Sequence, residues 1–273
     1  MTRYAFLGPA GTHSEEALLS LGLDGIEPVA CNTIPEVFAA VEEGRADAGV
    51  APIENSVEGS VNATLDALVF DTDLHIQSEF VRDIHNALIV APGVALRDVT
   101  AVYSHPQATA QCAGWLAKKL PGRPVLAANS TAEAVQRAVA EPGVAAVGTQ
   151  LAAALYGGEV LAGAIEDFHG NQTRFVVVGR GIRPPTGHDK TSLALFIHQN
   201  RPGALLMILS EFAYGQINLS KLQSRPTKKV LGEYMFFVDL QGHLEDANVA
   251  LALDCLRLKL RDVKVLGSYP AAR

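Results

Sequence analysis

Short apolar runs alternate with helix-length amphipathic segments over the first two thirds of the chain. The strand candidates are bounded by Gly, Pro or Asn, and the helix candidates carry apolar residues three or four positions apart. Strands are predicted at residues 4–7, 27–32, 47–53, 99–103, 125–128 and 145–148, and one more strand ends at residue 76. Helices are predicted at 12–21, 34–43, 62–69, 130–140 and 151–156, and one more helix begins at residue 104. Such βα units favour a parallel sheet with helices on both faces.

A long segment at residues 78–92 interrupts this rhythm and contains a further apolar run. The interruption predicts two lobes with a cleft between them, as in periplasmic binding proteins. One lobe comprises about residues 1–77 with 160–179, and the other comprises residues 78–159.

The pattern changes after residues 180–190, whose Pro and Gly content is typical of a linker. Strands are predicted at 191–197, 219–224, 233–240 and 263–267, with helices at 201–213 and 245–260. This βαββαβ order over residues 191–273 is ferredoxin-like, so the predicted fold class is α/β with two domains. The exposed strand edges of such a domain favour a homo-oligomer.

Composition narrows the function classes. The chain has 273 residues, is 48% hydrophobic and carries a net charge of −7, so nucleic acid and anionic membranes are disfavoured partners. No apolar run reaches the length of a membrane span, and the N-terminal apolar run is too short for a signal peptide. Three distant cysteines without metal-ligand spacing indicate reduced thiols in a cytoplasmic protein and no metal site.

Polar residues are concentrated at the ends of two predicted strands. Glu54, Asn55 and Ser56, with Gly59 after them, follow the third strand, where open α/β sheets place ligands. A second polar run, Asn171-Gln172-Thr173-Arg174, leads into the buried segment 175–178. Each has a structural alternative: Ser56 as a helix cap, and the second run as a turn whose Thr and Arg face solvent.

Two helix starts add further candidates. Gly8-Pro9-Ala10-Gly11 precedes Thr12, and the glycines allow either a ligand to approach backbone N–H groups or an ordinary βα turn. Ser104-His105-Pro106 opens a helix on which Gln107 and Gln111 share one face. His105 is a candidate base, although a lone His beside a capping Ser and a Pro is more often structural.

Together these motifs resemble the prephenate dehydratase family with a C-terminal ACT regulatory domain. The resemblance covers nearly the whole chain, in the family's order. It is carried by Gly8 to Thr12, Ala51 to Ser56 with Gly59, Ser104 to Gln107 with Gln111-Cys112, Asn171 to Phe175, Pro202 to Leu205 and Ser224 to Pro226. No chorismate mutase-like helical segment precedes them, so the monofunctional enzyme is expected.

The resemblance implies conversion of prephenate to phenylpyruvate, water and CO2 in phenylalanine biosynthesis, without a cofactor. It makes Thr173 the candidate donor to the leaving hydroxyl, with Asn55 and Gln111 as polar partners and Glu54 as a possible proton relay. Arg174 is a candidate clamp for a carboxylate, but neighbouring strand residues face opposite ways. The further substrate-binding candidates are Thr12, Ser56, Ser104, Gln107 and Asn171.

The resemblance also implies that phenylalanine binds between ACT domains as an allosteric inhibitor, in a dimer of dimers. The effector candidates are Gly203, Ala204, Leu205, Gln223, Ser224, Arg225 and Pro226. Two positions depart from the family pattern. Gln223 replaces the usual Glu, which bears on regulation, and His13 replaces an aromatic residue, which is interpreted as a packing difference.

Two alternatives remain open at this point. An arogenate dehydratase would use the same fold and chemistry, with an added counter-charge for an ammonium group. A solute-binding protein or non-catalytic amino-acid sensor would also suit the two-lobed pattern, although the complete motif set disfavours both.

Overall fold

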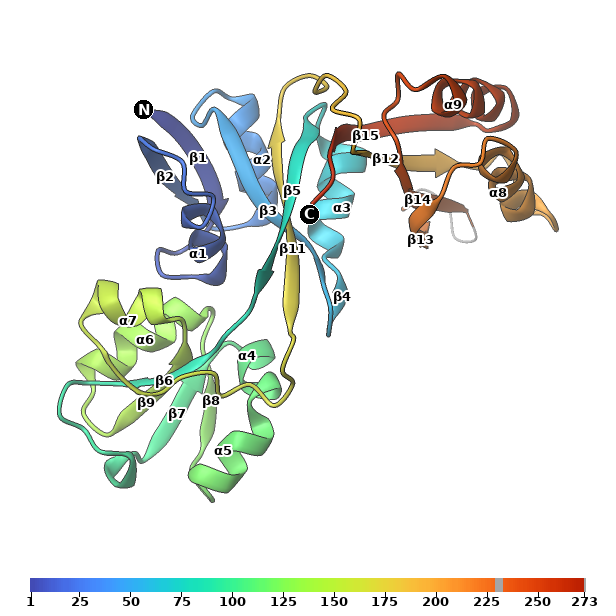
Figure 1. The fold of residues 1–273 in the computed structure, drawn as a ribbon. Helices are drawn as coiled ribbons and strands as arrows, with labels where there is room; N and C mark the ends of the chain where they lie inside the picture. The colour runs from blue at the N-terminus through green and yellow to red at the C-terminus, as the bar shows by residue number, and fades with distance from the viewer. Residues whose placement is uncertain (229–232, 273) are drawn as a thin grey trace. The chain divides into compact units, whose positions relative to one another are not determined.

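The computed structural model describes residues 1–228 and 233–272 (Figure 1). Contacts between residues divide the chain into two compact units, which we call the first unit and the second unit. The first unit is Met1–Val61 with Val81–Phe175, and the second is Asn62–Phe80 with Val176–Arg273.

The first unit begins with three parallel strands. β1 (Thr2–Leu7) pairs with β2 (Ile26–Cys31) on one side and with β3 (Ala48–Asn55) on the other. The helices between them are α1 (His13–Leu19) and α2 (Ile34–Glu42). α2 starts where Thr33 accepts a hydrogen bond from the backbone of Glu36, and it buries Val37, Phe38 and Val41.

A second sheet of the first unit has the strand order β10-β6-β9-β7-β8. Its strands are β6 (Ala87–Val90), β7 (Ala101–Ser104), β8 (Val125–Ala127), β9 (Val144–Gly148) and β10 (Glu159–Ala162). The helices that accompany them are α4 (Pro106–Gln111), α5 (Ala113–Lys119), α6 (Thr131–Ala140) and α7 (Gln150–Tyr156). A 3-10 turn, η2 (Leu96–Asp98), precedes β7. Leu88 and Val90 pack into one hydrophobic cluster, while Ala87 and Ile89 pack into another. Alternate residues of β6 are therefore buried on both faces, as expected for a sheet between helical layers.

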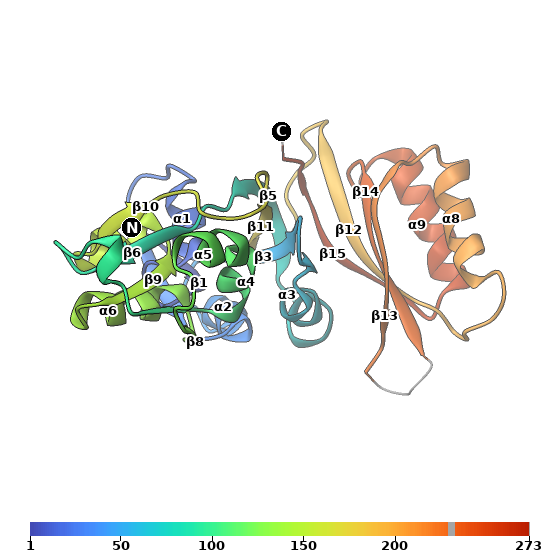
Figure 2. The same ribbon diagram turned by 90° about the horizontal axis from the view of Figure 1, so that it is seen from below.

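The second unit contains the predicted βαββαβ order. The elements are β12 (Asp189–Phe196), α8 (Ala204–Tyr214), β13 (Leu219–Pro226), β14 (Tyr234–Gln241), α9 (Ala247–Lys259) and β15 (Asp262–Pro270). β12 pairs antiparallel with both β14 and β15, and β13 pairs antiparallel with β14. Figure 2 shows α8 and α9 side by side on one face of this sheet, where Ile208, Phe212 and Leu253 join one core.

The other face of this sheet is covered by the segment α3 (Asn62–Asp66) and η1 (Ala67–Asp71), the latter a turn of π-helix. Lys264 donates to the backbone oxygens of Val69 and Thr72 at 2.9 and 2.8 Å. β15 also pairs with β5 (His75–Asp83) through Gly267 and Ile76. These contacts explain why residues 62–80 cluster with the C-terminal unit.

The predicted fold class is confirmed, and several element boundaries need correction. The strand predicted to end at 76 continues to Asp83, and the helix predicted to run to 69 changes to π-helix after Asp66. β10 and α5 were not predicted. Because β10 pairs with β6, residues 160–162 belong to the second sheet rather than to the other lobe.

The contact-based units also differ from the predicted domains at residues 62–80 and 176–179. The strands β5 and β11 (Gln172–Gly179) each contribute residues to both units. Residues 180–188 are exposed, as expected of a linker, whereas Asp189 is buried as the first residue of β12.

Candidate active site

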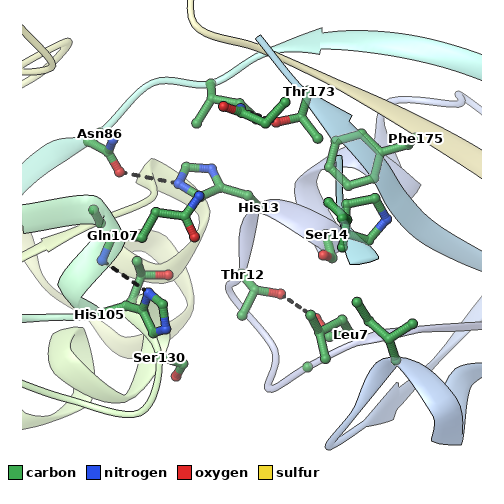
Figure 3. A pocket seen from close by; sticks show the side chains of 18 of the residues that line it. Leu7, Thr12, His13, Ser14, Asn86, His105, Gln107, Ser130, Thr173 and Phe175 are labelled. Carbon is green, nitrogen blue, oxygen red and sulfur yellow. Dashed lines mark hydrogen bonds between the residues drawn. The ribbon is translucent and has the colours of Figure 1, made fainter. Parts of the chain in front are cut away.

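A cavity of about 360 Å³ lies in the first unit, and we call it the first-unit cavity (Figure 3). Its volume falls in the range typical of small-molecule sites. Amides, hydroxyls and apolar side chains line it. In the described part of the chain, its lining contains no Asp, Glu, Lys or Arg, and its titratable side chains are those of His13 and His105.

A chain of hydrogen bonds joins four of the predicted site residues. Asn55 Nδ2 donates to Thr173 Oγ1 and to Asn171 Oδ1, both at 2.8 Å. Asn171 Nδ2 then donates to Gln111 Oε1 at 3.1 Å. Asn55 and Asn171 are 7% and 3% exposed, so these bonds are shielded from water and hold the side chains in fixed positions.

The position of Thr173 follows from its strand. Asn55 is the last residue of β3 and Thr173 is the second of β11, and the backbone N–H of Ser56 donates to the carbonyl of Gln172 at 2.8 Å. Strand alternation points Asn55 and Thr173 toward the cavity. Asn55 Oδ1 accepts from the backbone N–H groups of Val57 and Glu58, which fixes its amide orientation.

The Thr173 hydroxyl keeps its proton available. Its oxygen accepts from Asn55, and it donates to no residue in the part of the chain that the structure describes. A hydroxyl offers one proton and two lone pairs, so this arrangement leaves the proton for a molecule in the cavity.

The same alternation directs Glu54 and Arg174 elsewhere. Their side chains form an ion pair at 3.5 Å, and neither lines the cavity. The geometry therefore supports neither the relay from Glu54 nor the carboxylate clamp by Arg174. Ser56 is likewise outside the lining, where its hydroxyl accepts from the backbone of Gln172 at 2.9 Å.

The glycine-containing turn after β1 packs closely against α7. Gly11 has φ +86°, and a Cβ added there would come within 2.9 Å of Ala152 in α7. Its backbone N–H donates to Glu15 Oε2 at 2.5 Å and its carbonyl accepts from Thr149 at 2.6 Å, so neither faces a ligand. Thr12 lines the cavity but donates its proton to the carbonyl of Leu7 at 2.8 Å.

The residues at the start of α4 lie in two places, some in the lining of the cavity and one in the core. His105, Gln107 and Gln111 line the cavity, and His105 Nδ1 accepts from the backbone N–H of Gln107 at 3.3 Å as a helix cap. Ser104 is fully buried outside the lining and donates to the carbonyl of Val147 at 2.6 Å.

The thiol beside Gln111 is not a nucleophile. Burial, followed by the nearby carboxylates of Glu166 and Asp167, raises the pKa of Cys112 to about 12. A thiol with this pKa carries almost no thiolate near neutral pH. Cys112 packs instead with Leu88, Val102 and other apolar residues.

Two cavity residues were missed or undervalued from the sequence. Asn86 precedes the buried strand β6, a polar residue next to an apolar run, which is a weak signal. His13 was interpreted as a packing difference, but it lines the cavity with Asn86, and the two are hydrogen-bonded (Figure 3).

Comparison with known proteins decides the family. A sequence profile described as prephenate dehydratase matches residues 4–183. The chain belongs to the prephenate dehydratase family.

Individual relatives agree over almost the full length. A prephenate dehydratase from Mycolicibacterium vanbaalenii is 42% identical, and the match covers 99% of this chain and 91% of the relative. The crystal structure of prephenate dehydratase from Arthrobacter aurescens in complex with L-Phe has a TM-score of 0.91 at 38% identity, covering 98% and 90% of the two chains. The predicted family is thus confirmed.

One similar structure is named for a different enzymatic activity. GqqA, described as a novel type of quorum quenching acylase, has a TM-score of 0.89 at 31% identity, covering 98% of both chains. Membership in this fold therefore leaves the reaction to be argued from the cavity.

The predicted effector residues lie in the second unit. A second-unit cavity of about 220 Å³ is lined by His198, Arg201, Ala204 and Lys259, among others. Of the predicted effector residues, only Ala204 lines it. Gly203 caps α8 with φ +84°, and Leu205 packs against the core.

The predicted effector residues on β13 have different surroundings. Gln223 and Arg225 are half-buried and lie on one face of the strand, while Ser224 and Pro226 are exposed. Arg225 hydrogen-bonds to Asn62 and pairs with Asp66 at 2.7 Å. Its guanidinium therefore faces α3 of the second unit.

Two kinds of feature are absent from the described residues. No helix among them is long and apolar enough to cross a membrane. They also contain no group of three or more His, Cys, Asp and Glu side chains arranged to hold a metal ion.

Proposed function

We propose that the chain converts prephenate to phenylpyruvate, CO2 and water. The observation that carries the proposal is the Thr173 hydroxyl, which Asn55 holds at 2.8 Å with its proton free for a ligand in the first-unit cavity. Membership in the prephenate dehydratase family supports the same reaction.

The reaction makes specific demands on the protein. The bond from the ring to the departing carboxylate breaks, its electron pair enters the ring, and the C4 hydroxyl leaves with the C–O electron pair. One proton converts that hydroxyl to water, so the prephenate dianion plus a proton gives the phenylpyruvate monoanion, CO2 and water. The protein must align this hydroxyl and donate to it as charge develops on oxygen.

Thr173 meets this demand as a hydrogen-bond donor to the leaving hydroxyl. Asn55 donates to its oxygen, which polarises the hydroxyl and fixes its direction. Hydrogen bonds that strengthen in the transition state are worth more than uniform binding, typically ~10²–10³-fold in rate for one donor.

The other polar residues of the lining position the substrate. Gln111 accepts from Asn171, so its own NH2 group remains oriented toward the cavity. Gln107 and Thr12 add polar groups to the wall, and Asn171 acts behind it by holding Asn55 and Gln111.

The cavity favours prephenate over arogenate. Arogenate carries an ammonium group, and burying an ammonium without a paired carboxylate is costly. In the described lining of the cavity there is no Asp or Glu.

The acylase activity of GqqA is a second candidate that the geometry disfavours. Acyl transfer through serine requires a hydroxyl hydrogen-bonded to a base. In the described residues no hydrogen bond joins Ser14 or Ser130, which line the cavity, to His13 or His105.

A three-substrate assay tests this proposal. The purified chain is given prephenate, arogenate or an N-acyl amine, and phenylpyruvate, CO2, phenylalanine or free amine is measured. Rapid stoichiometric phenylpyruvate and CO2 from prephenate is expected. Turnover of arogenate or the N-acyl amine at a higher kcat/KM than prephenate would contradict it.

We further propose that phenylalanine inhibits the enzyme by binding at the second unit, which is an ACT-type regulatory domain in a homotetramer in the cytoplasm. The βαββαβ order of the second unit and the L-Phe complex of the Arthrobacter relative support this. Light scattering with and without phenylalanine tests the assembly, and a stable monomer at micromolar concentration contradicts it.

The domain division is also a proposal, with a catalytic domain at 1–179, a linker at 180–190 and the regulatory domain at 191–273. The exposure of residues 180–188 supports it. Limited proteolysis is expected to cut there first. Early cleavage elsewhere, with this stretch intact, would contradict the linker.

A further inference from the structure

The proposed substrate carries two carboxylates, yet the described lining of the first-unit cavity contains neither Lys nor Arg. Burying an anion without a counter-charge is costly. The two lining groups that can become cationic are His13 and His105. His105 Nδ1 accepts a backbone hydrogen bond, so this nitrogen carries no proton in the helix cap.

His13 has the opposite arrangement. Its Nε2 lies 3.2 Å from Asn86 Oδ1, and its Nδ1 lies 3.3 Å from Glu16 Oε2 without a hydrogen bond to it. Both neighbours are oxygen atoms that accept protons. A protonated ring nitrogen of His13 can therefore donate to either oxygen.

Asn86 supplies a second donor at the same place. Its side chain is 1% exposed, and its Oδ1 is occupied by His13. Its Nδ2 is buried without a hydrogen-bond partner in the described part of the chain, although the residue lines the cavity. An unpaired buried donor is destabilising, so such an atom marks a place where a ligand oxygen would be favourable.

The backbone of Asn86 is held firmly. Its N–H donates to Glu166 Oε2 at 3.0 Å, and its carbonyl accepts from the backbone of Ile165 at 2.9 Å. The pKa of Glu166 lies below its usual value: burial raises it, but the hydrogen bonds with Asn86 and His85, its own backbone N–H and the charge of His85 together lower it. The amide of Asn86 is therefore presented to the cavity by a rigid support.

We propose that His13 and Asn86 bind the substrate carboxylate that is retained in the product. This assignment rests on the proposed function and names a part of its binding site. Asn86 Nδ2 is a buried side-chain nitrogen without a hydrogen-bond partner among the described residues, and the ring of His13 lies against the same side chain. The unpaired amide donor of Asn86, beside His13 in the lining of the cavity, carries the assignment (Figure 3).

The chemistry selects which carboxylate they hold. The ring carboxylate loses its negative charge as CO2 forms, so a cation beside it would stabilise the ground state more than the transition state and slow the reaction. The pyruvyl carboxylate keeps its charge throughout. A cation there improves binding without raising the barrier.

The experiment compares His13→Phe and His13→Gln with wild type. His13→Phe keeps an aromatic ring, and His13→Gln keeps a hydrogen-bond donor, but both remove the charge. KM for prephenate and the inhibition constant of phenylpyruvate, which retains only the pyruvyl carboxylate, are both expected to rise about tenfold in each variant, with kcat changing less than about threefold. His188→Gln, at an exposed histidine of the second unit, is the matched control.

The outcomes separate the possibilities. Unchanged constants in both variants, with circular dichroism and melting temperature like wild type, overturn this inference but not the proposed function. A rise in KM without a rise in the phenylpyruvate constant overturns the assignment to the retained carboxylate. Wild-type constants for His13→Phe alone show that the ring only packs, and an inactive wild type overturns both proposals.

Discussion

The first-unit cavity and the second-unit cavity use charge in opposite ways. The first-unit cavity is lined by amides, hydroxyls and two histidines, and its described lining has no fixed charge. The second-unit cavity, with about 220 Å³, has Arg201 and Lys259 in its wall.

This difference follows from what each site is proposed to do. A site that expels CO2 gains nothing from a strong cation at the departing carboxylate, so neutral donors placed at the leaving hydroxyl suit it. A site that only binds an anion or a zwitterion gains directly from fixed charge. The predictions below test this contrast, from the largest expected free-energy effect to the smallest.

Thr173→Val tests the neutral donor in the first-unit cavity. Valine keeps the β-branched shape and removes the hydroxyl, so kcat is expected to fall at least ~10²-fold, equivalent to about 2.7 kcal/mol. Steady-state kinetics with prephenate measures this. Thr100→Val, at an exposed threonine outside the cavity, is expected to behave as wild type. A Thr173→Val enzyme with near-normal kcat would make Thr173 structural.

Asp66→Asn tests fixed charge inside the second unit. The carboxylate pairs with Arg225 at 2.7 Å and with Lys228 at 2.8 Å. Arg225 and Asp66 side chains are 13% and 14% exposed, so losing the charge-assisted hydrogen bond is expected to destabilise the second unit by about 2 kcal/mol.

Urea unfolding measures the loss. The matched control is Asp254→Asn, which removes a partner of Arg257 on the surface of α9 at 70% exposure. It is expected to cost at most ~0.5 kcal/mol. Equal effects of the two substitutions would refute a special role of the Asp66 pair.

Arg201→Gln tests the charged wall of the second-unit cavity. Lys259 already pairs with Glu211 at 2.5 Å, whereas Arg201 has no ion-pair partner among the described residues. If the carboxylate of phenylalanine binds there, its dissociation constant rises about tenfold by calorimetry. Arg257→Gln, an exposed arginine on α9, serves as control and leaves the affinity unchanged.

Gln223→Glu has the smallest expected effect. It restores the charge that the family usually carries at this half-buried position of β13. Phenylalanine affinity is expected to stay equal or to increase by at most about tenfold, because a charge-assisted hydrogen bond to the ammonium is worth ~1–2 kcal/mol. Weaker binding in the Glu variant, by calorimetric titration, would contradict this. No binding to either form would show that the unit is not a phenylalanine sensor.

Much of the fold could be predicted because its signals are local. The apolar periodicity located most helices and strands, and the βαββαβ order after the linker was correct. The polar runs at the ends of β3 and β11 predicted Asn55 and Thr173 as neighbours of a site. Strand alternation even indicated that Thr173 and Arg174 face opposite ways, which the Glu54–Arg174 ion pair agrees with.

The remaining features depend on contacts between distant segments. Only the tertiary structure decides that α3 covers the sheet of the second unit, since Asp66 and Arg225 meet across 159 positions of sequence. The same is true of His13 and Asn86, which are 73 positions apart. A sequence determines which side chains an element presents to one face, because that periodicity is set by the backbone. It does not specify which distant group satisfies a buried polar atom, because that choice is made when the elements pack.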